Sequence, residues 1–318
     1  MMKSIRLTGL FAATAATVIL LAGCEKENEN TVDNRPVKAR ITSTIDGMAT
    51  RAAGTAWAPG DRIGVYADNT EGANFLTNAP YITTEGDGVF TAEGGEFYFQ
   101  DKGNVQFFAY YPFEGTDGTL PGESGTGSKI RKTITAADQA PAAQPKIDYL
   151  FAGRTTASST APNVQFQFNH CMSRIVLNFL PGDGITALDD IEYTLEGILP
   201  EGTFDTYFGR AIADATTPAE PLTMSVSGSA ALELTSSLIF FPQHSGDDKT
   251  LTLTMRGTTY TATFKFKENP NNNNVRELAA GHTYTYNVKI NNTSMTISPA
   301  TVNAWEEGGS ENIGSNPI

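Results

Sequence analysis

The stretch Val37-Lys38-Ala39-Arg40-Ile41-Thr42-Ser43-Thr44-Ile45-Asp46 alternates apolar and polar side chains. One face would carry Val37, Ala39, Ile41 and Ile45, and the other Lys38, Arg40, Thr42, Thr44 and Asp46. A period of two is typical of a β-strand with one buried and one wet face. We therefore expect the first strand of the protein here.

The same period governs most of the chain that follows. It is clearest in Val164–Phe168, Leu251–Met255, Tyr260–Lys267 and Thr283–Ile290. The Pro59-Gly60 pair fits a type II turn leading into a strand over Arg62–Tyr66. No stretch of a dozen residues has a helical period, so the sequence predicts an all-β protein built of antiparallel β-sandwiches with Greek-key-type connections.

The length of 318 residues suits two domains. The segment rich in small polar residues from Thr155 to Asn163 is interpreted as the boundary between them. We expect an N-terminal sandwich over residues 36–163 and a C-terminal sandwich over residues 164–318.

The N-terminus carries export signals. Lys3 and Arg6 precede the apolar run Leu7–Leu21, which is short for a membrane span and is followed by Ala22, Gly23 and Cys24. This arrangement resembles the signal peptide and lipobox of bacterial lipoproteins. We expect residues 1–23 to be a signal peptide, Cys24 to carry the lipid, palmitate included, and the polar residues 24–35 to be a tether at the cell outer membrane.

Composition argues against several classes of function. The formal net charge of −13 disfavours binding of nucleic acid. His170, His244 and His282 are far apart, and no His-Glu-x-x-His, Cys-x-x-Cys or Gly-x-Ser-x-Gly motif occurs, so we predict no enzyme activity, no metal site and no cofactor. A hydrolase that uses a pair of carboxylates is a remaining alternative.

A basic residue among small ones follows the first strand, in Ala49-Thr50-Arg51-Ala52-Ala53-Gly54. Such a segment invites proteolysis, although Arg51 also fits an ordinary loop. A cut after Arg51 would sever the strand containing Val37, Ala39, Ile41 and Ile45 from its domain. The exposed groove would accept a strand from another subunit by β-augmentation.

Motifs across the whole chain resemble the fimbrillins that build type V pili on Gram-negative surfaces. They are the lipobox at Cys24, Thr50-Arg51-Ala52, Trp57 with Gly60–Tyr66, Asp148–Ala152, Phe168-Asn169-His170 with Ser173-Arg174, Phe241-Pro242-Gln243, Gly281–Val288, and Val302–Trp305.

The resemblance implies two tandem transthyretin-like β-sandwich domains, export as a lipoprotein, cleavage between Arg51 and Ala52 by an arginine-specific protease, and donor-strand assembly into a surface fimbrium with other fimbrial subunits, as a homo- or heteropolymer. The donor would lie in residues 295–309, with Met295, Ile297, Val302 and Trp305 as candidate donor side chains, although Pro299 interrupts this stretch.

Two questions stay open at this point. The subunit belongs to the stalk, to the tip, where it would bind a host or glycan ligand, or, if it is never cleaved, to the base. The rival hypothesis is a lipid-anchored glycan-binding protein in which exposed aromatic residues such as Trp57, Tyr110 or Tyr111 stack on sugar rings.

Overall fold

The structure is a computed structural model that describes residues 36–45, 57–68, 75–125, 127–269 and 272–305. Residues 36–318 form one compact unit. Strands dominate it, with short 3-10 helices at Glu123–Gly125, Ala137–Gln139 and Gln144–Lys146, so the all-β prediction is confirmed. Among the described residues, no helix is long and apolar enough to cross a membrane.

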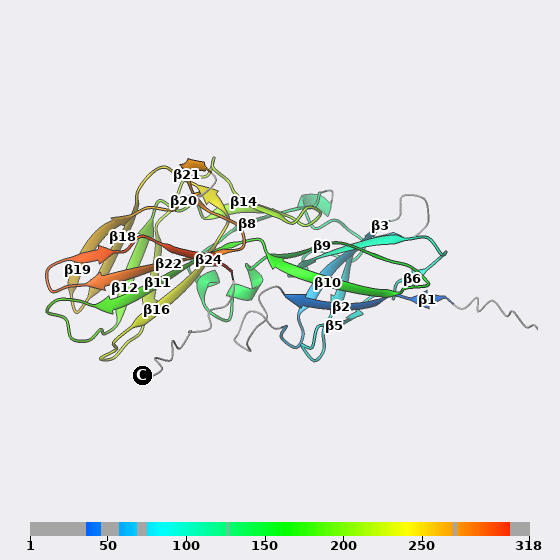
Figure 1. Cartoon of the computed structure of the whole chain (residues 1–318), viewed down its shortest axis with the longest axis horizontal. Coiled ribbons are helices and arrows are strands. Elements are labelled where there is room, and N and C mark those ends of the chain that lie inside the picture. The colour runs from blue at the N-terminus through cyan, green and yellow to red at the C-terminus, as the bar shows by residue number, and fades with distance from the viewer. Residues whose placement is uncertain (1–35, 46–56, 69–74, 126, 270–271, 306–318) are drawn as a thin grey trace, which may run out of the picture. The chain divides into compact units, whose positions relative to one another are not determined.

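The first half is a sheet closed on itself (Figure 1). Its strands, in hydrogen-bonded order, are β10 (Asn163–His170), β2 (Arg40–Ile45), β5 (Val89–Ala92), β4 (Leu76–Ile82), β3 (Arg62–Asp68), β7 (Val105–Tyr111) and β9 (Leu150–Ala157), which pairs again with β10. The first strand in the sequence, β1 (Val37–Lys38), pairs with β6 (Tyr98–Phe99) in a separate two-stranded sheet. Alternate side chains of these strands point inward and fill the barrel with a core that includes Ile63, Val65, Phe107, Val164 and Phe168.

The second half is a sandwich of two sheets. One contains β16 (Leu234–Phe240), β11 (Ser173–Pro181), β22 (His282–Ile290), β23 (Met295–Ile297) and β24 (Thr301–Ala304). The other contains β15 (Leu222–Val226), β12 (Ile191–Glu196), β18 (Lys249–Met255) and β19 (Thr258–Phe264). A shared core, with Ile175, Tyr193, Leu251 and Tyr286 among its members, lies between them.

Two short sheets complete the fold. One joins β8 (Lys129–Thr133), β13 (Glu201–Asp205) and β14 (Arg210–Ala213), and the other joins β17 (Gln243–His244), β20 (Lys267–Asn269) and β21 (Asn272–Leu278). Because β8 precedes the second half in sequence but pairs with β13, it ties the two halves together. A third apolar cluster reinforces this link, and a buried hydrogen bond joins Tyr66 Oη and Thr206 Oγ1 at 2.9 Å.

The predicted domain boundary needs correction. Residues 155–163 are not a linker, because β9 and β10 pair antiparallel and Ser158 and Ala161 exchange backbone hydrogen bonds in the turn between them. β10 therefore belongs to the barrel, and the chain passes to the second set of sheets after His170 instead of at residue 163.

The expectation of purely antiparallel sheets is also wrong at two places. β2 pairs parallel to β10, and β11 pairs parallel to β22. Two parallel neighbouring strands need a long connection. Most of the first half connects β2 to β10, and most of the second half connects β11 to β22. Nor is the first half an open sandwich, because the pairing of β9 with β10 closes its sheet.

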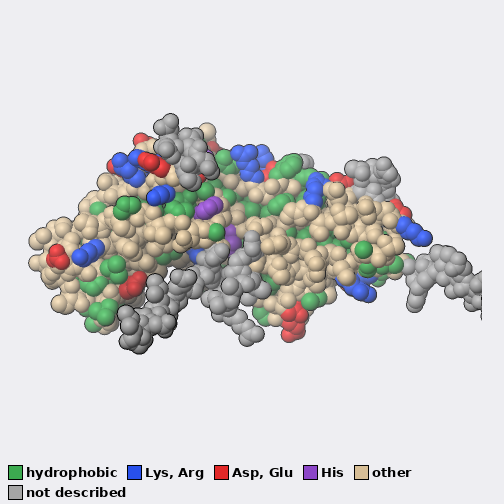
Figure 2. All heavy atoms as spheres, viewed as in Figure 1, with side chains coloured by type: hydrophobic (Ala, Val, Ile, Leu, Met, Phe, Trp, Pro, Cys, Tyr) green, Lys and Arg blue, Asp and Glu red, His purple; other side chains and the backbone are tan. Residues whose placement is uncertain are grey.

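Charged side chains of both signs are interspersed over the visible face of the molecule (Figure 2). Exposed ion pairs of the described residues include Arg62 with Glu93 and Arg256 with Asp189. Asp189 also accepts a hydrogen bond from the Ala230 backbone, and Asp190 accepts one from Gly228. These two carboxylates therefore hold a loop, as expected of acidic residues in turns.

Candidate functional site

Strand β2 is an inner strand of the barrel, between β10 and β5. Its residues from Arg40 to Ile45 pair with Asn163 to Phe168, and Ile41 and Thr42 pair with Phe90 and Val89. The predicted strand over residues 37–46 is thus present as β1 and β2, within the described part of the segment.

The face of β2 that points into the barrel is apolar, as the sequence pattern predicts. Ala39, Ile41 and Ile45 are buried, with exposed fractions of 3%, 2% and 4%, and Val37 is half-buried. Together they pack on the same core as Phe90, Phe168 and Trp57. Two buried isoleucines stabilise the strand by about 3–6 kcal/mol, to which its backbone pairing adds.

Ser43 is an inward residue that the sequence analysis left out of this face. It is 9% exposed, and its hydroxyl has no hydrogen-bond partner among the described residues. A buried hydroxyl without a partner costs about 1–3 kcal/mol. Within β2, Ile41 and Ile45 therefore fit the groove well and Ser43 fits it poorly.

The backbone around Ser43 is closely packed as well. The Ser43 N–H donates to the Gly88 carbonyl oxygen at 2.8 Å, and a Cβ on Gly88 would lie 2.4 Å from the Ser43 carbonyl oxygen. Gly88 also has φ +80, a conformation that favours glycine. This approach fixes how β2 lies against the turn that precedes β5.

An aromatic cage lies next to β2. The Trp57 ring contacts Phe90, Tyr111 and Phe168 edge to face, at centroid distances of 5.2, 5.3 and 5.2 Å. Trp57 and Tyr111 are each 8% exposed and Tyr110 is 0% exposed. The exposed aromatic platform assumed for the glycan-binding alternative is therefore wrong, because all three rings belong to the interior.

The processing residues proposed from the sequence fall outside the described residues. This applies to the signal peptide, Cys24 with its tether, Arg51 and Ala52, Asp46, and the end of the donor candidate beyond residue 305. Ile45 and Trp57 are the described residues on either side of the segment with Arg51, and both line one cavity.

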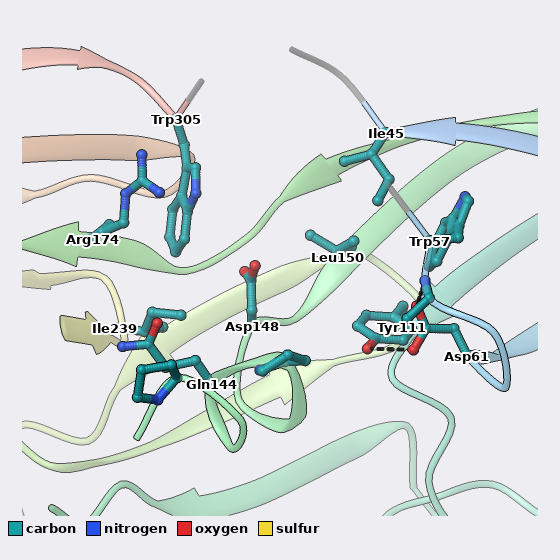
Figure 3. Close-up of a pocket in the computed structure, with 13 residues that line it drawn as sticks. Ile45, Trp57, Asp61, Tyr111, Gln144, Asp148, Leu150, Arg174, Ile239 and Trp305 are labelled. Atoms are coloured by element: carbon teal, nitrogen blue, oxygen red, sulfur yellow. Dashed lines mark hydrogen bonds between the residues drawn. The ribbon is translucent and has the colours of Figure 1, made fainter. Parts of the chain in front are cut away.

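This cavity has a volume of about 480 Å³ (Figure 3). Apart from Ile45 and Trp57, its wall contains Ala58, Asp61, Tyr111, Pro141, Gln144, Pro145, Asp148, Leu150, Arg174, Ile239 and Trp305. Asp61 accepts hydrogen bonds from the Tyr111 hydroxyl at 3.1 Å and from the Ala58 backbone at 2.7 Å. Burial, and then the negative charges of Asp61 and Asp148, raise the pKa of Tyr111, which therefore stays a neutral donor.

The candidate donor strand is bound to its own half. β23 and β24 both pair antiparallel with β22, and Pro299 lies in the gap between them, where a missing N–H costs no ladder bond. Met295 and Trp305 are buried, with exposed fractions of 7% and 5%, while Ile297 and Val302 pack partly buried on the same core as Met295.

Two side chains lie against the Trp305 ring. His170 stacks on it at a centroid distance of 4.4 Å, and the Arg174 guanidinium lies 5.0 Å from its centroid. The backbone N–H of Trp305 donates to the Gly281 carbonyl oxygen at 2.7 Å, and His170 Nδ1 lies 2.9 Å from Asp148 Oδ1. These contacts join the end of β24 to the end of β10.

The remaining candidates for chemistry do not form a site. Cys171 is buried, and burial followed by the charge of Asp148 raises the pKa of its thiol, which disfavours a reactive thiolate. His244 Nδ1 lies 3.3 Å from Glu277 Oε2, and His244 is far in the sequence from the other two histidines. Within the described ranges, no group of three His, Cys, Asp or Glu side chains is arranged to hold a metal ion.

Comparisons with known proteins address the family. A family model described as "Fimbrillin-like" matches residues 50–305. "Putative fimbrium subunit Fim1C" of Bacteroides uniformis is 31% identical over 310 residues, which cover 94% of this chain and 95% of the relative.

Solved structures also resemble this chain. A "putative cell adhesion protein" from Bacteroides ovatus is 34% identical, with a TM-score of 0.73 over 85% of this chain and 99% of the other. A second one, from Bacteroides uniformis, has a TM-score of 0.64 at 22% identity over 84% of this chain and 99% of the other, and supports the fold alone. The resemblance inferred from the motifs is confirmed. This chain belongs to the fimbrillin-like family.

Proposed function

We propose that this protein is a fimbrial subunit whose N-terminal strand is exchanged for a strand of a neighbouring subunit. The observation that carries the proposal is the position of β2, which fills an inner place in the barrel while its buried face includes the unsatisfied hydroxyl of Ser43. A donor strand with an apolar side chain at that position would bind the same groove without this cost.

Cleavage of the chain after Arg51 would start the exchange. The precursor is exported as a lipoprotein and held at the outer membrane through Cys24. An arginine-specific protease then cuts after Arg51, so the lipid and β2 leave on one fragment and the subunit is released as its groove opens. Each half would be a variant of the transthyretin-like sandwich that the family resemblance implies, with the sheet of the first half closed by the pairing of β9 with β10.

The place of the subunit in the fimbrium is inferred from the C-terminal strand. To act as a donor, β23 and β24 would have to leave β22, which would expose Met295 and remove Trp305 from between His170 and Arg174. Exposing both side chains costs about 3–6 kcal/mol before any new contact forms. We therefore favour a tip subunit, which accepts a strand and donates none, and whose free surface would serve adhesion.

N-terminal sequencing of the protein recovered from cell-surface filaments tests this function. We expect the recovered chain to begin at Ala52, because only the cut form has an open groove. A chain that still begins at Cys24 would contradict the exchange. Immunogold labelling of the same filaments should mark their ends, whereas labelling along the whole filament would assign the subunit to the stalk.

A further inference from the structure

The cavity beside Trp57 contains a carboxylate oxygen that accepts no hydrogen bond from the described residues around it. Asp148 accepts a hydrogen bond at Oδ1 from His170, whose Nδ1 must carry the hydrogen because a carboxylate only accepts. Among the described residues, no hydrogen bond reaches Asp148 Oδ2. Figure 3 shows this carboxylate pointing between Arg174 and Trp305 on one side and Leu150 and Ile45 on the other.

The charges of the cavity favour a cation as the missing partner. Asp61 and Asp148 are both part of its wall, and the Asp148 side chain is only 15% exposed. Arg174 is the basic residue of the described wall, and it lies over Trp305 and donates to Thr283 Oγ1 at 3.0 Å. A positive group inside the cavity would therefore meet more negative than positive charge, in surroundings that screen it weakly.

Cleavage would supply such a group within reach. Hydrolysis of the Arg51–Ala52 peptide bond adds one water molecule and leaves a carboxylate on Arg51 and an ammonium on Ala52. Ala52 precedes Trp57 by five residues, which span at most about 17 Å when extended. Since Trp57 and Asp148 line the same cavity, a chain of this length can place the new N-terminus at the carboxylate.

We propose that the cavity is the binding site for the α-ammonium group of Ala52, with Asp148 as its partner. This inference rests on the proposed cleavage after Arg51. The uncut chain has a neutral peptide bond between Arg51 and Ala52 and so lacks the ligand. Processing would then have two effects. It frees the groove of β2, and it fixes the new N-terminus in the cavity at the Ile45 end of that groove.

A sugar fits the same cavity less well. Stacking requires an open ring face, but His170 and Arg174 already lie against the Trp305 ring, and the Trp57 ring contacts three aromatic neighbours. A primary ammonium needs only the carboxylate and a small volume.

The test measures how fast the Ala52 amine reacts. The precursor over residues 24–318 is cut with trypsin, the start at Ala52 is verified by sequencing, and the amine is acylated with trace acetic anhydride at pH 7. Mass spectrometry gives the rate for the native chain and for the same chain unfolded in urea. An ammonium paired with a carboxylate has a pKa raised above its usual value near 7.8, and a rise of one unit slows acylation about tenfold.

Variants separate the possible results. We expect Asp148→Asn, whose amide oxygen still accepts from His170, to bring the native rate within about twofold of the unfolded rate. Asp183→Asn is the matched control, because its side chain is 97% exposed, and it should leave the slow native rate unchanged. Equal native and unfolded rates in the wild type would overturn the inference while leaving the cleavage intact, and this comparison needs no variant to fold. Slow acylation that persists in a folded Asp148→Asn chain would also overturn it. If no cut occurs at Arg51, the inference and the proposed processing both fail.

Discussion

Replacing Ile41 with aspartate lowers the free energy of unfolding of the precursor by at least about 3–5 kcal/mol, as measured by urea denaturation. Ile41 is 2% exposed and pairs with Val164 on one side and Phe90 on the other. The substitution removes a buried aliphatic side chain and places a carboxylate without a partner in the barrel.

Thr44→Asp is the control for this variant, because Thr44 lies on the same strand and is exposed. We expect its effect to remain within about 0.5 kcal/mol. After cleavage and loss of the strand, the Ile41→Asp chain becomes identical to the wild type, so the difference between them should disappear. An Ile41→Asp precursor as stable as the wild type would show that β2 does not contribute to the fold.

Replacing Arg51 with alanine should abolish release of the N-terminal strand. Before cleavage β2 is part of the same chain as its groove, so its effective concentration there is high. After cleavage the strand is held by noncovalent contacts alone and dissociates on dilution. Native mass spectrometry after trypsin treatment should therefore show loss of the fragment from the wild type and its full retention in Arg51→Ala.

Arg51→Lys is the matched variant for the protease. Trypsin cuts after lysine as well as arginine, so this variant should release the fragment with trypsin but keep it with an arginine-specific protease. Release of the strand from Arg51→Ala would place the switch elsewhere in the chain.

Alternation in the sequence predicted which side chains of β2 are buried, because the period of a strand fixes its faces. It did not predict the neighbours. The parallel pairing of Arg40–Ile45 with Asn163–Phe168 depends on how the chain returns through the whole barrel, and no local pattern encodes that return. For the same reason the sequence does not show that residues 155–163 contain the end of β9, a turn and the start of β10.

In the candidate site, too, burial depends on tertiary contacts that the sequence pattern does not show. Met295 and Trp305 were identified as strand residues, but their burial against the chain's own β22 and against His170 and Arg174 follows from tertiary contacts. Trp57, Tyr110 and Tyr111 illustrate the converse, since an aromatic residue in a strand fits a core and a binding surface equally well. The burial of Ser43 does not follow from the pattern, because a polar residue interrupts the apolar face without changing its period.

The most direct test of strand exchange is the uptake of a labelled synthetic peptide with the sequence of residues 36–46, followed by fluorescence anisotropy. The chain cut after Arg51 should bind the peptide, and the uncut precursor should not. A peptide with Ser43→Val should bind about fivefold more tightly, since it removes a cost of about 1 kcal/mol, and one with Ile41→Asp should not bind. Uptake by the uncut chain, or a cut chain that sheds its strand and binds none of these peptides, would contradict the account.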